Sequence, residues 1–301
     1  MPGFRSSSTG VSLICRAMPL TLLKLSCPDR VGLMARVTGF IAAHGGSLCE
    51  VNQFTDTRAG WFFARMAIDS KTLRVPLSEL RVDFAPVGAE LGARWTIRRE
   101  TERVRVVLMV SRLGHCLVDL LWRWRAEELN CDIVGVISNH EEFRAAVERE
   151  GLPFHHIAMP PEGKMEALAR VEHLWGELGA DLIVLARYMQ VIPPDICERW
   201  MGRIVNIHHS FLPAFAGANP YRQAWERGVK IIGATCHYVT AELDAGPIIE
   251  QEVVRVEHFH TPEDLLRMGR DAERQALSRG VRWHTSDRVL LHGARVVVFR
   301  D

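Results

Sequence analysis

The sequence predicts an α/β protein made of two blocks, a small βαββαβ block followed by a larger, doubly wound and mostly parallel block. In the first block, strand-like alternation and helical spacing of apolar residues succeed one another in that order. In the second, apolar runs of strand length alternate with helices of about 10–15 residues, as parallel crossover units require. We therefore expect an extension at residues 1–18, a first domain at 19–99 and a second at 100–301.

The first block shows the pattern of a small sheet covered by helices on one face. Leu33, Val37, Phe40 and Ile41 recur at helical spacing before the pair Gly45 and Gly46 ends the helix. Around this helix the predicted elements are strand 20–26, strands 47–56 and 61–68 joined by the turn 57–60, helix 76–91 and strand 94–98.

The second block opens on residues 104–110, a continuous apolar run that is typical of a strand buried on both faces. Its later strands are predicted at 133–138, 154–158, 182–185 and 204–207, and its helices after residue 116, at 141–150, 164–178 and near 194–199. The tail adds long strands at 230–239 and 247–256, a long helix at 262–283 and a hairpin at 288–299.

Composition excludes several classes of protein. Lys plus Arg (37) nearly balance Asp plus Glu (36), so no overall positive field favours nucleic acid or an anionic membrane. No apolar run reaches the roughly 20 residues of a membrane span. The seven cysteines are scattered without a C-x-x-C pair, which favours reduced, mostly buried thiols. We expect a cytoplasmic protein whose first 18 residues are a disordered extension or precede the true start at Met18.

The most polar stretch directly follows a predicted strand of the parallel sheet, where open α/β sheets bind ligands. Asn206 and His208 are two residues apart, so on an extended segment both side chains point to the same side. A carboxamide and an imidazole facing one cleft could hold an oxyanion and move a proton. The alternative is a turn at the end of the strand in which both side chains satisfy backbone groups.

Asp244 is the second candidate, in the loop between the two long late strands and just ahead of Gly246 and Pro247. An Asp in such a loop could simply form a turn. If it meets Asn206 and His208, the three have the chemistry to hydrolyse an amide-like carbonyl: Asp and His activate water, and Asn donates to the developing oxyanion.

Two further interpretations of the histidines are weaker. A metal site could draw on His208, His209, His237 and Asp244, but adjacent histidines on an extended segment are expected to point apart, and the spacing H-E-x-x-H is absent. A nucleophilic pair of Cys236 and His237 would need strand neighbours to face the same way. We therefore expect no metal, and Cys236 in the core.

Four stretches carry a resemblance to a known family. Residues 206–215 (NIHHSFLPAF), 217–221 (GANPY), 233–240 (GATCHYVT) and 243–249 (LDAGPII) closely resemble the two signatures of the folate-dependent formyl transferases and hydrolases. The resemblance extends over about residues 20–300. It implies that Asn206 and His208 polarise a formyl carbonyl and that Asp244 orients water and assists proton movement.

The same resemblance implies a folate pocket. Its expected lining residues are Arg187, Tyr188, Met189, Gln190, Val191, Ile192, Gly217, His237, Val239 and Thr240. Judged from the residues alone, Met189, Val191 and Ile192 could equally be core residues at a strand–helix junction.

Residues 111–115 (SRLGH) distinguish two branches of that family. The glycinamide ribonucleotide transformylases have a glycine-rich loop here whose N–H groups hold the phosphate of the acceptor. This chain has one glycine beside the bulky Arg112, Leu113 and His115, which is similar to the deformylase version. The resemblance thus implies that water takes the formyl group, although an ordinary strand–helix turn would have the same residues.

The βαββαβ block resembles an ACT domain, a regulatory module that pairs with a copy of itself. Asp29, Arg30, Gly32 and Leu33 open its first helix, whose N–H groups could hold the carboxylate of an amino-acid effector. A purely structural dimerisation domain is the alternative. An ACT domain ahead of a formyltransferase-like domain is the arrangement of the deformylase branch.

Taken together, the resemblance implies a hydrolase that converts 10-formyltetrahydrofolate to formate and tetrahydrofolate, serving one-carbon balance and formate supply for purine synthesis. It implies a small-molecule folate substrate, no tightly bound cofactor, no nucleic-acid or membrane partner, and a homo-oligomer, either a dimer or a tetramer. The alternatives are formyl transfer to an amine acceptor and a non-catalytic sensor of folate or amino acids.

Overall fold

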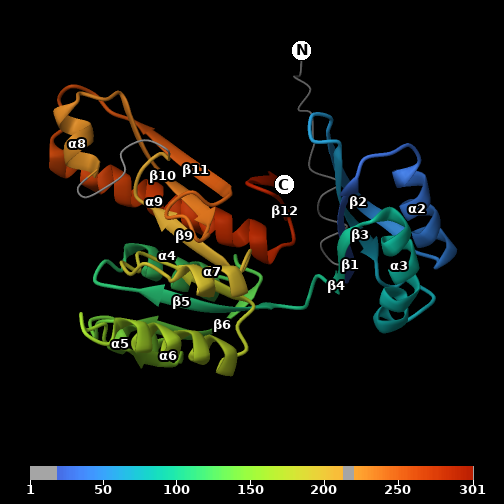
Figure 1. The fold of residues 1–301 in the computed structure, drawn as a ribbon, viewed down its shortest axis with the longest axis horizontal. Helices are drawn as coiled ribbons and strands as arrows, with labels where there is room; N and C mark the ends of the chain where they lie inside the picture. Colours follow the sequence, from blue (N-terminus) through green and yellow to red (C-terminus); the bar gives the residue numbers. More distant parts are fainter. Residues whose placement is uncertain (1–18, 213–219, 301) are drawn as a thin grey trace, which may run out of the picture. The chain divides into compact units, whose positions relative to one another are not determined.

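The computed structural model describes residues 19–212 and 220–300, so the expected extension at 1–18 lies outside it. The chain divides into two compact units, with the boundary between Glu102 and Arg103 (Figure 1). No helix within the described residues is long and apolar enough to cross a membrane.

The first unit has the predicted βαββαβ order and an antiparallel sheet of order β2-β3-β1-β4. Both helices lie on one face of this sheet (Figure 1). This confirms the predicted ACT-like fold. Its elements are β1 (Leu20–Pro28), α2 (Leu33–Ala43), β2 (Ser47–Asp56), β3 (Trp61–Asp69), α3 (Leu77–Leu91) and β4 (Arg94–Arg99).

The start of α2 shows why the chain turns where it does. Gly32 has a φ of 89°, a left-handed conformation that glycine adopts without steric cost. Leu33 is buried in the core of the unit, and the exposed Arg30 donates a hydrogen bond to the carbonyl of Glu90 on α3. Of the four residues predicted to bind an effector, Asp29, Arg30 and Gly32 are therefore exposed, while the Leu33 side chain packs inside.

The second unit is the predicted doubly wound sheet, of order β11-β10-β9-β8-β5-β6-β7. Strands β5 to β9 run parallel, and β10 and β11 add an antiparallel edge. The parallel part consists of β5 (Val104–Val110), α4 (His115–Arg125), β6 (Cys131–Ser138), α5 (Arg144–Arg149), β7 (Phe154–His156), α6 (Lys164–Glu177), β8 (Leu182–Leu185), α7 (Pro194–Arg199) and β9 (Ile204–His208). The remainder consists of α8 (Pro220–Glu226), β10 (Ile231–Tyr238), β11 (Ile248–Arg255), α9 (Pro262–Thr285), β12 (Val289–His292) and β13 (Arg295–Val298).

The predicted elements differ from the observed ones only at their ends, but helix α8 (Pro220–Glu226) was not predicted. The helix expected at 141–150 begins at Arg144, because residues 141–143 form a turn in which the N–H of Arg144 bonds to the carbonyl of Glu141. The strand expected at 154–158 ends at His156, where its pairing with β6 stops.

Two apolar cores cover the two faces of the sheet. One core contains Leu117 of α4 and Ala276 of α9, packed against strand residues such as Cys236 of β10. The other contains residues of α6 and α7, such as Trp175. Cys236 is fully buried, as predicted. Helix α9 approaches β10 closely at Gly280, where an added Cβ would lie 2.3 Å from the Cys236 sulfur. This contact holds α9 against the strands that carry the candidate site.

We expect Gly280→Ala to destabilise the protein by about 1–3 kcal/mol, because the new methyl group overpacks the contact between α9 and β10. Gly176→Ala on α6 is the matched control: a Cβ there meets no atom within 4 Å, so alanine should stabilise the helix by about 0.5–1 kcal/mol. Urea unfolding followed by circular dichroism measures both variants. Equal effects of the two substitutions would contradict this description of the packing.

Candidate active site

Strand β9 presents the predicted amide and imidazole to one side of the sheet. Asn206 and His208 lie on the last residues of this extended strand, and their side chains therefore share a face. The antiparallel neighbour β10 places His237 directly opposite Asn206 and Thr235 opposite His208. The pairing of two strands thus brings four polar side chains to one end of the sheet.

The loop between β10 and β11 brings Asp244 to the same place. Its backbone folds back so closely that a Cβ on Gly246 would lie 1.7 Å from the carbonyl oxygen of Tyr238, which only glycine can avoid. Asp244 itself has a φ of 56°, a left-handed conformation that Asp tolerates better than most residues but that still costs energy. A strained loop therefore sets the position of the carboxylate.

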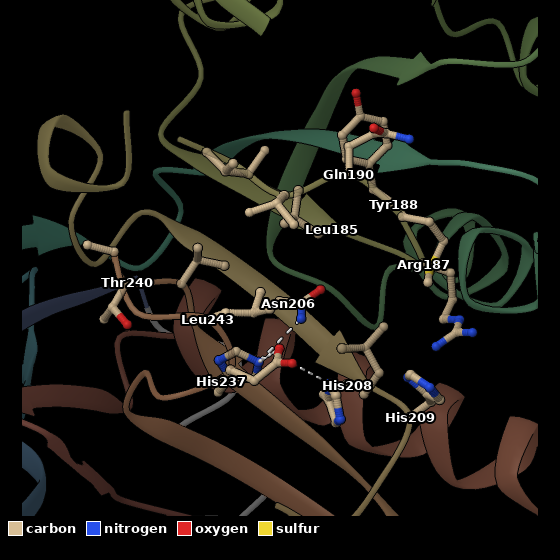
Figure 2. A pocket seen from close by; sticks show the side chains of 17 residues that line it. Leu185, Arg187, Tyr188, Gln190, Asn206, His208, His209, His237, Thr240 and Leu243 are labelled. Carbon is tan, nitrogen blue, oxygen red and sulfur yellow. Dashed lines mark hydrogen bonds and ion pairs between the residues drawn. The ribbon is translucent and has the colours of Figure 1, made fainter. Parts of the chain in front are cut away.

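Four side chains meet in a connected group (Figure 2). Nδ1 of His208 lies 3.2 Å from one oxygen of Asp244, and Nε2 of His237 lies 3.7 Å from the other. The side-chain nitrogen of Asn206 lies 3.3 Å from Nε2 of His237. The structure thus brings Asn206, His208 and Asp244 together, as the sequence predicted, and adds His237 to them.

Hydrogen bonding determines which nitrogens carry protons. Nδ1 of His237 lies 2.9 Å from the carbonyl oxygen of Tyr238 and must donate to it, so Nε2 of a neutral ring accepts from the Asn206 amide. One N–H of that amide remains for another acceptor. In His208, Nδ1 donates to Asp244, while the buried Nε2 has no hydrogen-bond partner within the described part of the chain. No described residue therefore forms a hydrogen bond with Nε2 of His208.

The electrostatics favour an ionised Asp244 beside neutral imidazoles. The hydrogen bond from His208 holds the pKa of the Asp244 carboxyl below its ordinary value. Burial lowers the pKa of His237, and burial together with the Arg187 charge lowers the pKa of His209 to about 4. At neutral pH the site therefore combines an ionised Asp244 with neutral His209 and His237 rings.

A cavity of about 280 Å³ opens beside this group. Every predicted folate-pocket residue that the structure describes lines it: Arg187, Tyr188, Met189, Gln190, Val191, Ile192, His237, Val239 and Thr240. Gly217 lies outside the described residues. Met189 and Val191 are more than half exposed, whereas Tyr188 and Ile192 also pack in the core beneath.

The expectation that His208 and His209 point apart is wrong, because their ring centroids lie 4.9 Å from each other. β9 ends at His208, so His209 lies beyond the extended segment and no longer follows the alternation of a strand. Figure 2 shows the side chains of Arg187 and His209 next to each other beyond the end of β9.

Several lining residues were not predicted. They are Leu185, Ile207, His209, Ala241 and Leu243. Leu243 could have been found as the neighbour of Asp244 in its loop. The position of His237, bonded to Asn206 and beside Asp244, depends on the register of β9 and β10, which the sequence does not state.

Comparison with known proteins places this geometry in context. Residues 104–281 match the model of the formyl transferase family. Over 93% of its length the chain is 46% identical to a formyltetrahydrofolate deformylase of Corynebacterium sp. (strain P-1), covering 98% of that protein. It is 45% identical to the Bacillus subtilis formyltetrahydrofolate deformylase over 92% of this chain and 93% of that one.

Solved structures agree. A formyltetrahydrofolate deformylase from Pseudomonas syringae superimposes with a TM-score of 0.93 at 50% identity, covering 96% of this chain and 97% of that one. A glycinamide ribonucleotide transformylase from Symbiobacterium toebii is 32% identical and superimposes with a TM-score of 0.62. This match covers 66% of this chain and 95% of that one.

We expect the protein to lose stability as pH falls from about 6.5 to 4, partly through His209. Its ordinary pKa is 6.5 and its folded-state pKa is about 4, so between these values the unfolded chain binds a proton that the folded protein does not. The free energy of unfolding should fall by up to roughly 3 kcal/mol from this group. The free energy of unfolding of His209→Gln should fall less steeply with decreasing pH than that of the unchanged protein. The exposed His173→Gln should show the same pH dependence as the unchanged protein. Equal slopes for all three proteins would contradict the assignment.

Proposed function

This chain belongs to the formyltetrahydrofolate deformylases, a branch of the formyl transferase family, and on that premise we propose how its pocket removes a formyl group. The enzyme is a hydrolase that acts on 10-formyltetrahydrofolate and releases formate and tetrahydrofolate. The observation that supports our assignment of roles is the Asp244 carboxylate, 3.2 Å from His208 and connected through His237 to Asn206 at the edge of the cavity.

We propose that the cavity receives the bicyclic head of the folate. Its volume of about 280 Å³ lies at the lower end of the range for small-molecule sites, which suits a ring system better than a whole folate. Leu185, Ile192 and Leu243 supply apolar walls. With the head inside, the formyl group on N10 can lie beside Asn206 and His208.

Water then attacks the formyl carbon. In our proposal Asp244 accepts a hydrogen bond from this water, and the free amide N–H of Asn206 donates to the carbonyl oxygen as it becomes negative. Nε2 of His208 takes a proton from the water and passes it to N10 as the bond between carbon and N10 breaks. The oxygen of water leaves in formic acid, which loses the second proton of the water to solvent and becomes formate, and tetrahydrofolate leaves with the first proton on N10.

The first unit supports two finer proposals. We infer that it self-associates, because the edge strand β2 carries the exposed apolar residues Val51 and Phe54. We also propose that an amino-acid effector binds at the start of α2, where Asp29, Arg30 and Gly32 are exposed.

Purified protein should release formate from 10-formyltetrahydrofolate with no amine present. Asp244→Asn should lower kcat by about 10²–10⁴-fold while folate still binds, because a neutral amide cannot orient the water and stabilise a protonated His208 as the carboxylate does. Asn206→Ala should lower kcat by about 10²–10³-fold through loss of an oxyanion donor. Steady formate release is the readout.

Asp195→Asn is the matched control, since Asp195 lies on the surface of α7 and its side chain is 62% exposed. It should behave as the unchanged protein does. Formate release that requires an added amine would indicate the transferase, and unchanged turnover in Asp244→Asn would refute the catalytic assignment. No turnover by the unchanged protein, together with folate binding, would indicate a sensor.

Gly246→Ala should lower kcat/KM by about 10²-fold, because the methyl group displaces the loop that positions Asp244. Gly176→Ala, which meets no neighbouring atom, should leave kcat/KM unchanged. Full activity in Gly246→Ala would show that the close approach to Tyr238 does not control the carboxylate.

A further inference from the structure

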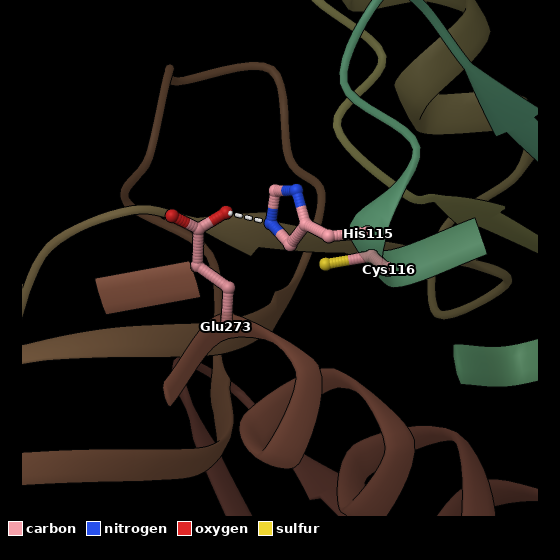
Figure 3. A group of neighbouring side chains, drawn as sticks. All are labelled: His115, Cys116 and Glu273. Atoms are coloured by element: carbon pink, nitrogen blue, oxygen red, sulfur yellow. Dashed lines mark hydrogen bonds and ion pairs between the residues drawn. The ribbon is translucent and has the colours of Figure 1, made fainter. Parts of the chain in front are cut away.

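Helix α9 is attached to the elements around it by polar side chains as well as by its apolar face. Near its middle, the buried Glu273 accepts hydrogen bonds from Nε2 of His115 (Figure 3) and from the Tyr221 hydroxyl, both at 2.8 Å. In its last turn, Nδ1 of His284 lies 2.6 Å from the hydroxyl oxygen of Tyr238 on β10. The catalytic roles proposed above involve neither the Tyr238 side chain nor His284.

Tyr238 is the last residue of β10, and its side chain points away from the cavity. Successive residues of a strand point to opposite faces, so His237 lines the cavity while Cys236 and Tyr238 pack in the core beside α9. Tyr238 is only 2% exposed. Burial raises the pKa of its hydroxyl above the ordinary value, so the hydroxyl keeps its proton and donates it to Nδ1 of a neutral His284 ring.

The backbone of Tyr238 contacts two parts of the candidate site. Its N–H donates to the carbonyl of Pro247 at 2.9 Å, and its carbonyl oxygen accepts from Nδ1 of His237 at 2.9 Å. The same oxygen lies against Gly246, in the loop that carries Asp244. A movement of the Tyr238 backbone would therefore change the orientation of the His237 ring and the position of the Asp244 carboxylate together.

The sheet is irregular where β10 reaches the site. The register between β10 and β11 shifts between Cys236 and His237, so the ladder on that side is interrupted just before the strand ends. Such bulges are common beside active sites, where they change the direction of a side chain. On the other side, Tyr238 pairs with Val205 of β9. The hydrogen bond to His284 adds an attachment from the opposite face of the sheet, at the point where the ladder is irregular.

We propose that the hydrogen bond between Tyr238 and His284 positions the Asp244 carboxylate for catalysis. Both are positioning residues, which act through the Tyr238 backbone, and neither is among the residues that line the cavity. The inference rests on the proposed function, because it concerns the geometry of the same reaction. His284 lies beyond residues 104–281, the part of the chain that matches the family model. The contact thus adds a residue of the C-terminal segment to those that control the site.

Tyr238→Phe removes the hydroxyl and keeps the ring that fills the core. We expect kcat for formate release to fall by about tenfold, because a small misplacement of catalytic groups slows the reaction. KM for 10-formyltetrahydrofolate should change by less than about twofold, since Leu185, Ile192 and Leu243 still supply the apolar walls. In the Asp244→Asn background the same substitution should lower kcat no further, because the hydroxyl acts through that carboxylate.

His284 offers a matched pair of variants. The side-chain oxygen introduced by His284→Asn lies near the place of Nδ1 and can accept from Tyr238, so this variant should keep kcat within about twofold. His284→Leu has no acceptor and should lose kcat by about tenfold, as Tyr238→Phe does. Trp124→Phe is the control: it removes a hydrogen bond to the Cys131 carbonyl in the same core, away from the cavity, and should leave kcat unchanged.

NMR of the protein with ¹⁵N-labelled histidine measures the same effect without turnover. The Nδ1 proton of His237, which the Tyr238 carbonyl holds, should exchange with water at least about tenfold faster in Tyr238→Phe. An unchanged exchange rate, or an unchanged kcat, in folded Tyr238→Phe would overturn the proposal.

Two other results would also overturn it: a loss in Tyr238→Phe that multiplies with that of Asp244→Asn, and equal activity of the two His284 variants. If Tyr238→Phe does not fold, the comparison of His284→Asn with His284→Leu decides the matter. Absence of formate from the unchanged enzyme would instead refute the proposed function, and the exchange of the His237 proton would still test the positioning role.

Discussion

The structure depends on one contact, between the Asp244 carboxylate and the His208 imidazole, which come from segments 36 residues apart that the sheet must align. The antiparallel pairing of β9 and β10 sets the imidazole beside His237, and the tight return of the loop at Gly246 sets the carboxylate against both rings. Each partner then stabilises the other: the histidine favours the ionised carboxyl, and the carboxylate orients the ring so that Nε2 is free to transfer a proton. The remaining polar groups of the pocket are arranged around this pair.

Backbone strain occurs at the same place. Asp244 and Arg187 both have left-handed φ angles although neither is glycine, and both line the cavity. Such conformations persist only where the surrounding packing enforces them, and here β-sheet pairing and the close-packed helix α9 provide that support. The rigid sheet thus bears the energetic cost of positioning these two charged side chains beside the cavity.

Much of this architecture could be predicted from local patterns. Alternating strands and helices indicated the doubly wound sheet, and the spacing of Asn206 and His208 showed that they share a face. What could not be predicted depends on long-range register and on burial of charge. His237 becomes a partner of Asn206 only through the alignment of β10 with β9, and His209 approaches His208 because the strand ends between them. Glu273 gave one signal, an acidic residue within the apolar stripe of a long helix beside Ala272 and Ala276, but its partners lie on three other segments.

A double-mutant cycle on kcat/KM tests the central claim most directly, because it measures whether Asp244 and His208 act as one unit. The cycle compares the unchanged enzyme with Asp244→Asn, His208→Gln and the double variant, all in formate release. If the contact is the basis of catalysis, the double variant should be about as slow as the slower single variant, as is usual for residues that act together. Effects that multiply, so that the double variant is slower by the product of the two single losses, would show that the two residues act independently and would contradict the account.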